Sequence, residues 1–330
     1  MYSRHATDRS RGQILLVTAV ILALLFVGFI GTLYVGASTA DDRATGPHDY
    51  TSEAQNGVQT ATYAMEDALL TANTDRTLTF QSDREAAATE SVRAAATNLD
   101  AAGRFDGRIV DVSLQDYSGT ATPAGTRVVQ NAEGNLSSNT GSGNWTVISG
   151  ADQTRQASVR VDPLSLPTNA SGATNITLVG DTTETVGIHR TGSNVTLAHS
   201  NGRCNVGEIG LGIDNPRATA DLIGGRLTLT TDGTTYGGSC TDYTPPENVE
   251  RIEIENGNQT TGTLGVVSLG AAVQGTNVTS TTTPPAAGAA SDPTAHHVVY
   301  AVPVELTVAT DRTTTRRLVV VAPGTNEMPS

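Results

Sequence analysis

The residue types that could carry out catalysis or hold a metal are few and scattered in this chain. It has six histidines, two cysteines and no lysine. Without lysine there is no phosphate-binding loop of the GxxxxGK type, and no GxSxG sequence marks a nucleophilic serine. His296 and His297 are adjacent and would point to opposite faces of a strand, so they do not form a metal pair. The sequence therefore predicts a protein that is not an enzyme and holds no metal or cofactor.

One acidic pair has the spacing of catalytic carboxylates. Glu253 and Glu255 would share one face of a strand, as the two carboxylates of a glycosidase could if both projected into a cleft. A solvated strand face explains the same spacing without any chemistry. We adopt the second interpretation, and an extracellular hydrolase remains a hypothesis without a motif.

The two cysteines, Cys204 and Cys240, could form a disulfide bond. An even pair of cysteines is typical of a bridged domain outside the cytoplasm. A bridge would close a loop of about 36 residues and stabilise the fold by about 3–4 kcal/mol. Two buried free thiols are the alternative. The membrane topology derived below favours the disulfide.

Seven asparagines carry the Asn-X-Ser/Thr sequence, or sequon, that accepts N-linked glycans in secreted proteins. They are Asn135, Asn144, Asn169, Asn175, Asn194, Asn258 and Asn277. A threonine-rich chain produces several sequons by chance, but all seven lie beyond residue 130. The pattern predicts a glycoprotein without indicating which sites are used.

The N-terminal region contains the strongest signal in the sequence. Residues 13–37 are an uncharged, apolar run of 25 residues. A helix of this length spans a hydrocarbon core of about 30 Å. Arg4, Arg9 and Arg11 precede the run, and the basic flank of a membrane segment stays in the cytoplasm. We therefore expect a single-pass membrane protein with a cytoplasmic N-terminus and the bulk of the chain outside the cell.

A cleaved secretory signal peptide is the alternative interpretation of this run. Val35-Gly36-Ala37 offers small residues at which a peptidase could cut. Cleaved peptides, however, have apolar regions of about 7–15 residues, and this run is much longer. Its length favours a signal anchor that stays attached.

A basic residue and a glycine stand directly before the apolar run, in Arg11-Gly12-Gln13. This arrangement resembles the class III signal peptide of archaeal type IV pilins and archaellins, over residues 9–37 alone. The resemblance implies that a prepilin peptidase cuts between Gly12 and Gln13 and that the apolar helix then packs against other pilin-like subunits. Bacterial-type pilins carry Glu at the fifth mature position, where this chain has Val17. A plain signal anchor is the alternative.

The chain is acidic, with a formal net charge of −13, although only 16% of its residues are charged. The acid excess argues against nucleic acid as a partner, because nucleic-acid binding needs a basic surface. The absence of lysine, the abundant threonine and alanine and the acidity together resemble proteins of halophilic archaea. In concentrated salt, repulsion between charges is screened within about 3 Å. A disordered, solvating segment is the alternative interpretation of this acidity.

Two helices are expected after the apolar run. Residues 51–73 place apolar side chains, such as Met65 and Leu69, at three- and four-residue spacing, which is the period of an amphipathic helix. Residues 82–102 are rich in alanine and end before Gly103, a residue type that commonly terminates helices.

From Ile109 onward the period of the pattern changes to two. Apolar residues alternate with polar ones, as in Val302, Val304 and Leu306, and clusters of Gly, Asn, Asp and Pro separate the runs. This is typical of an antiparallel sheet with one solvated face. Pro303 within one run predicts an edge strand.

The predicted fold class is α+β, with a transmembrane helix and a helical stalk followed by an antiparallel β-rich ectodomain that is sandwich- or barrel-like. The chain then divides into a leader at 1–12, the transmembrane helix at 13–37, a helical stalk region at 38–105, the extracellular domain at 106–323 and a tail at 324–330.

We therefore expect a cell-surface protein, a pilin-like or minor-pilin-like subunit with an extracellular β domain. Its expected partners are the lipid bilayer, other pilin-like subunits that pack through the apolar helix, and a prepilin peptidase. The alternative is a monomeric, membrane-anchored adhesin or solute-binding ectodomain with no role in a filament.

Overall fold

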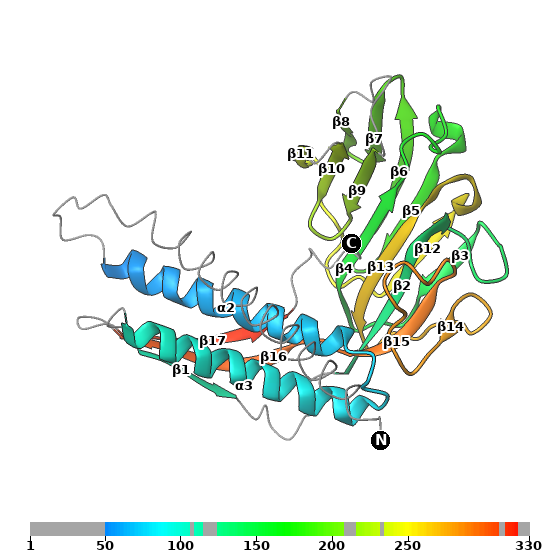
Figure 1. Ribbon diagram of the computed structural model, residues 1–330. Helices are drawn as coiled ribbons and strands as arrows, with labels where there is room; N and C mark the ends of the chain where they lie inside the picture. The colour runs from blue at the N-terminus through cyan, green and yellow to red at the C-terminus, as the bar shows by residue number, and fades with distance from the viewer. Residues whose placement is uncertain are drawn as a thin grey trace, which may run out of the picture. The chain divides into compact units, whose positions relative to one another are not determined.

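The computed structural model describes most of the chain after residue 49 (Figure 1). The described residues are 50–105, 109–114, 124–207, 216–231, 234–309 and 314–322. The predicted processing site at Arg11, Gly12 and Gln13 and the apolar run at 13–37 lie outside them. Among the helices of this described part, none combines the length and the apolar character needed to cross a membrane.

Two antiparallel helices begin the described chain (Figure 1). They are α2 (Tyr50–Thr74) and α3 (Gln81–Phe105), and they confirm the helices expected at 51–73 and 82–102. Helices of this composition are marginal in water by themselves, so their stability depends on burying the apolar stripe that each presents.

The two helices bury these stripes on a three-stranded antiparallel sheet. Its strands, in spatial order, are β1 (Ile109–Leu114), β16 (Val302–Ala309) and β17 (Thr314–Val321). Met65 of α2 and Val92 of α3 belong to one buried core with Leu306 and Val308 of β16. We call α2, α3 and this sheet the helix–sheet unit.

The remaining strands form two sheets that share a larger core. The eight-stranded sheet has the order β11 (Thr234–Ser239), β10 (Arg226–Thr231), β9 (Arg217–Asp221), β4 (Gln153–Val161), β13 (Thr261–Leu269), β2 (Ala124–Asn135), β15 (Thr294–Val299) and β14 (Thr279–Ser280). The six-stranded sheet has the order β3 (Trp145–Ile148), β12 (Arg251–Glu255), β5 (Thr174–Val179), β6 (Thr183–Thr191), β7 (Asn194–His199) and β8 (Gly202–Val206). All the strand pairs are antiparallel except β14 with β15.

Apolar side chains of both sheets meet in a single core, so this region is a β-sandwich. Ile176 and Leu178 of β5 point inward and alternate with half-buried threonine and asparagine, as the period of two predicts. Trp145, the only tryptophan, is buried in this core, where its Nε1 donates a 3.1 Å hydrogen bond to the backbone O of Leu136.

The sandwich and the helix–sheet unit are joined at the last turn of α2. The buried side chain of Asn73 donates a 2.9 Å hydrogen bond from Nδ2 to the backbone O of Val299, at the end of β15. Its Oδ1 accepts a 2.7 Å bond from the backbone N of the same residue. The side-chain amide of Asn73 thus forms the same pair of hydrogen bonds that a neighbouring strand would form. It satisfies both the backbone N and the backbone O of Val299.

Arg84 of α3 caps the C-terminal end of α2. The residue is 1% exposed, and its guanidinium donates to the backbone O atoms of Ala72 and Asn73, at 3.1 and 3.0 Å. The last carbonyls of a helix have no partner within the helix and carry partial negative charge, so a buried cation satisfies and stabilises them. Burial lowers the pKa of Arg84 from its usual value. No local pattern in the sequence indicates that this arginine is interior.

The predicted fold class, α+β with a transmembrane helix and a helical stalk, is wrong. The described residues form mostly strands and contain only two α-helices. The helices also do not form a stalk ahead of a separate β domain. Their apolar faces need a surface to cover, and β16 and β17 supply it from the far end of the chain.

The edge-strand prediction from Pro303 is also wrong. Strand β16 lies between β1 and β17 and is the centre of its sheet. Among the described residues the ladder with β1 extends to Val304, and Pro303 lies one residue further along β16, opposite Val320 of β17. A proline is tolerated near the start of a strand, where few ladder bonds depend on its backbone nitrogen.

Candidate functional site

The adjacent histidines occupy opposite faces of β15. His296 is 3% exposed, whereas His297 is exposed to solvent. Burial, with the nearby positive charges of Arg127 and Arg84, lowers the pKa of His296 to about 3, so the ring is neutral at ordinary pH. Neither ring nitrogen has a hydrogen-bond partner among the described residues. Within the described residues, no three His, Cys, Asp or Glu side chains are grouped closely enough to hold a metal ion.

The acidic pair of β12 lies on the outer face of the sandwich. Ile252 and Ile254 fill the core, so Glu253 and Glu255 point the other way. The carboxylate of Glu253 forms a 3.4 Å ion pair with Nε of Arg251 on the same strand. A partly solvated pair of this kind is typical of a strand face and contributes at most about 1 kcal/mol to stability.

Cys204 and Cys240 are joined by a disulfide bond. Cys204 lies in β8, the last strand of the six-stranded sheet, and Cys240 directly follows β11, the last strand of the eight-stranded sheet. Their Cα atoms are 5.6 Å apart. The bond therefore links the two sheets at their edges, next to the edge strands β8 and β11.

Several polar side chains near this disulfide form hydrogen bonds. The phenol of Tyr243 donates a 2.8 Å bond to the backbone O of Leu222, and burial raises its pKa above the usual value. Glu184 accepts hydrogen bonds from both the backbone N (2.7 Å) and the hydroxyl of Ser200. Because Ser200 donates to a carboxylate and bonds to no histidine, this arrangement fixes a turn and does not activate a nucleophile.

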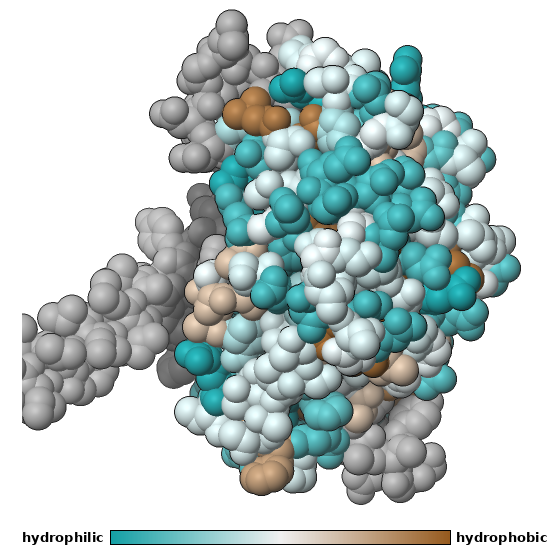
Figure 2. All heavy atoms as spheres, turned by 90° about the vertical axis from the view of Figure 1, so that its right-hand side faces the viewer, coloured by the Kyte–Doolittle hydropathy of each residue, from teal (hydrophilic) through white to brown (hydrophobic). Residues whose placement is uncertain are grey.

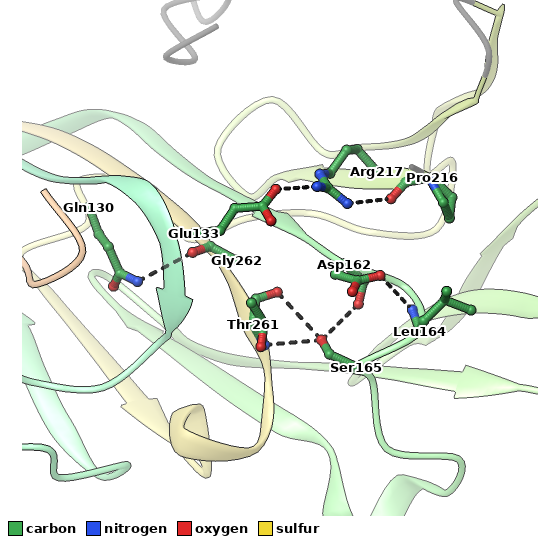
Figure 3. A network of polar contacts seen from close by, with 9 residues as sticks. All are labelled: Gln130, Glu133, Asp162, Leu164, Ser165, Pro216, Arg217, Thr261 and Gly262. Carbon is green, nitrogen blue, oxygen red and sulfur yellow. Dashed lines mark hydrogen bonds and ion pairs between the residues drawn. The ribbon is translucent and has the colours of Figure 1, made fainter. Parts of the chain in front are cut away.

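A second polar network ties together the ends of β2, β4, β9 and β13 (Figure 3). Arg217 of β9 forms an ion pair with Glu133 of β2. The hydroxyl of Ser165 accepts from the backbone N of Thr261 at 3.0 Å and donates to the backbone O of Asp162 at 2.8 Å. These bonds hold the first residue of β13 next to the segment that follows β4. The network is structural, because its groups satisfy one another.

The structure separates the seven sequons into two groups. The exposed asparagines are Asn135, Asn144, Asn169 and Asn258, and the half-buried ones are Asn175, Asn194 and Asn277. The four exposed asparagines gather at one end of the sandwich, around the turn between β12 and β13. No sequence pattern could have shown this grouping, because it depends on which strands pair.

The surface of the sandwich is polar on the face seen in Figure 2. Hydrophilic and weakly polar side chains predominate there, and hydrophobic ones form small, separate patches. A face of this kind suits display to solvent, whereas an obligate interface is richer in apolar side chains.

No protein-family model matches the chain, and the search of curated proteins gives no match either.

Proposed function

We propose that the protein is a single-pass cell-surface protein of a halophilic archaeon, a pilin-like or minor-pilin-like subunit that displays the β-sandwich outside the cell. The observation that carries the proposal is the sequence Arg11-Gly12-Gln13 directly before the uncharged run at 13–37. In this proposal the run inserts in the bilayer, the arginines stay in the cytoplasm, and a prepilin peptidase removes residues 1–12.

The disulfide supports the extracellular location. Disulfides persist in oxidising compartments and are rare in the cytoplasm, and Cys204 and Cys240 are the only cysteines of the chain. The polar face in Figure 2 and the net charge of −13 also suit a domain that faces a salty medium.

Removal of the leader would change what the apolar run can do. The uncut chain carries Arg4, Arg9 and Arg11 on the cytoplasmic side, and these charges hold the run in the bilayer. The cut chain begins at Gln13, so the run can leave the lipid and pack against the runs of other subunits. Gly28 and Gly31 within it allow helices to approach closely.

The mature N-terminus tests the proposal. Mass spectrometry of the protein purified from its own membranes should show a chain that begins at Gln13. The variant Gly12→Val should keep residues 1–12, because a prepilin-type peptidase requires a small residue before the cut. The control Gly31→Val makes the same change inside the apolar run and should still be processed.

A wild-type chain that retains Arg11 would contradict the pilin-like route. That result would leave the alternative, a membrane-anchored adhesin or solute-binding ectodomain with no role in a filament.

A further inference from the structure

The turn between β12 and β13 (residues 256–260, the β12–β13 turn) is the meeting point of sequons that are far apart in the sequence. Asn258 lies within the turn, in the short helix η2 (Gly257–Gln259). Asn144 reaches it directly, because its Oδ1 accepts a 2.9 Å hydrogen bond from the backbone N of Asn256. These two acceptors thus belong to one small surface.

Asn135 adjoins the same turn from β2. It lies opposite Thr261, the first residue of β13. The backbone N of the next residue, Leu136, donates a 3.0 Å bond to the backbone O of Thr260.

Asn169 completes the group through the short helix η1 (Ala170–Gly172). Its Oδ1 caps η1 by accepting a 3.0 Å hydrogen bond from the backbone N of Gly172. The residue after η1, Ala173, accepts a 3.2 Å bond at its backbone O from Nδ2 of Asn256. Four sequons spread from residue 135 to residue 258 therefore surround one turn.

The atom that would be modified is available in all four. Asn144 and Asn169 use only Oδ1 in their hydrogen bonds, so Nδ2 is left unused. The described contacts of Asn135 and Asn258 include no side-chain hydrogen bond, and both residues are exposed. A glycan is bulky and must project into solvent in the native fold, and these positions permit that.

The three half-buried sequons lack this freedom. Nδ2 of Asn277 donates to the backbone O of Thr146 (3.4 Å) and to Oε1 of Gln274 (3.1 Å). A glycosylated nitrogen keeps one hydrogen, so one of these bonds would be lost. Asn175 is half-buried and lies within the sheet, opposite Gly187 of β6. Asn194 is half-buried as well.

We propose that Asn135, Asn144, Asn169 and Asn258 are the N-glycosylation sites of this protein and make the end of the sandwich at the β12–β13 turn a glycan-bearing surface. The sequons at Asn175, Asn194 and Asn277 stay unmodified. This proposal rests on the proposed extracellular location.

The co-reactant is a sugar carried on a lipid phosphate. At each site Nδ2 forms a bond to the anomeric carbon of the sugar, and the bond between that carbon and the phosphate oxygen breaks. The lipid phosphate leaves with the electron pair, and Nδ2 loses one proton.

Glycopeptide mass spectrometry tests the assignment on the full-length protein made in a haloarchaeal host that N-glycosylates its own surface proteins. Peptides that contain the four exposed asparagines should carry sugar, and those with Asn175, Asn194 and Asn277 should not. Sugar on any of these three would overturn the proposal. So would its absence from the four exposed sites when a surface protein of the same cells is glycosylated.

Two matched variants give an independent measurement. Asn258→Gln should lower the intact mass by one glycan, and the side chain it replaces makes no hydrogen bond that the fold needs. Asn277→Gln should leave the number of glycans unchanged. An unchanged glycan mass in the first variant, or a lost glycan in the second, would contradict the assignment.

Failure of this proposal can be distinguished from failure of the pilin-like route. A mature chain that still begins at Met1 contradicts the pilin-like route alone, because an anchored ectodomain meets the same glycosyltransferase. A processed, disulfide-bonded chain without sugar contradicts the glycan surface alone. Free thiols at Cys204 and Cys240 in a sugar-free chain would overturn both.

Discussion

The sandwich and the helix–sheet unit use the chain in opposite ways. The sandwich core draws on one continuous stretch, from Val128 to Ala295. The core of the helix–sheet unit joins residues 58–110 to residues 299–321, so its two halves come from opposite ends of the described chain. Both cores depend on pairing between distant strands, such as β13 with β2 in the sandwich, but the pairing of β1 with β16 in the helix–sheet unit closes a longer loop. We therefore expect the two cores to differ in stability.

Covalent reinforcement differs as well. The only disulfide of the chain lies within the sandwich, where it links the two sheets. The helix–sheet unit depends on apolar packing and on polar contacts such as those of Arg84 and Asn73. Two signals can follow the regions separately, because Trp145 reports on the sandwich core and far-ultraviolet circular dichroism reports on α2 and α3.

The largest expected effect follows from a cavity in the helix–sheet unit. Leu306 of β16 is 0% exposed, and Leu306→Ala should lower the free energy of unfolding of this unit by about 3–5 kcal/mol. In a denaturant titration the helical signal should be lost at a lower concentration than the Trp145 signal. Leu318→Ala is the matched control on β17, where the side chain is 58% exposed, and should shift neither transition measurably. Coincident loss of both signals in Leu306→Ala would show that the two cores unfold as one.

A somewhat smaller effect is expected in the sandwich when its disulfide is removed. The double variant Cys204→Ser/Cys240→Ser opens a loop of 36 residues, which should lower the free energy of unfolding by about 3 kcal/mol. The Trp145 fluorescence transition should move to lower denaturant, while the helical transition moves less. A shift confined to the helical signal would contradict the assignment of the disulfide to sandwich stability.

The smallest effect concerns pH and His296, on the strand whose end bonds to Asn73. The pKa of His296 in the fold is about 3, below the value of about 6.5 that histidine has in an unfolded chain. As pH falls below about 6.5, the unfolded chain takes up a proton that the folded chain does not, so stability falls. One such group contributes at most about 1.4 kcal/mol per pH unit.

Unfolding titrations between pH 7 and pH 5 measure this slope. His296→Gln should reduce it, and the exposed neighbour provides the control His297→Gln, which should leave it unchanged. Part of the slope should remain, because burial also lowers the pKa of His189. An equal slope in wild type and His296→Gln would show that His296 is not kept neutral by the fold.

Local patterns predicted the elements whose two faces differ. The three- and four-residue spacing of Met65 and Leu69 correctly indicated α2, and the alternation of Val304, Leu306 and Val308 correctly indicated β16. Strand β13 was not identified, because both of its faces are buried and its sequence, Thr261–Leu269, does not alternate. When both faces of a strand are buried, its residues do not alternate between apolar and polar, so the period of two is absent from the sequence.

The sequence showed which chemical groups are present, but it did not show which of them lie close together in the fold. The sequence contained every sequon and both cysteines, and the spacing of Glu253 and Glu255 correctly placed them on one strand face. It could not show that Asn135, Asn144, Asn169 and Asn258 surround one turn, because that depends on β2 pairing with β13 and on the bonds of Asn256. Nor could it show that Arg84, on a polar-looking helix, is interior.

The sequence by itself determined the apolar run at 13–37, its basic flank, the acidic balance and the period of each amphipathic element, because each of these depends on residues close together in the chain. Only the tertiary structure decided that β16 and β17 return to cover α2 and α3, which replaced the expected stalk with a second core. Burial of an apolar face requires some partner surface, and local sequence does not specify which distant segment supplies it. The chain topology, which brings β16 and β17 against α2 and α3, therefore determines which segment covers the helices.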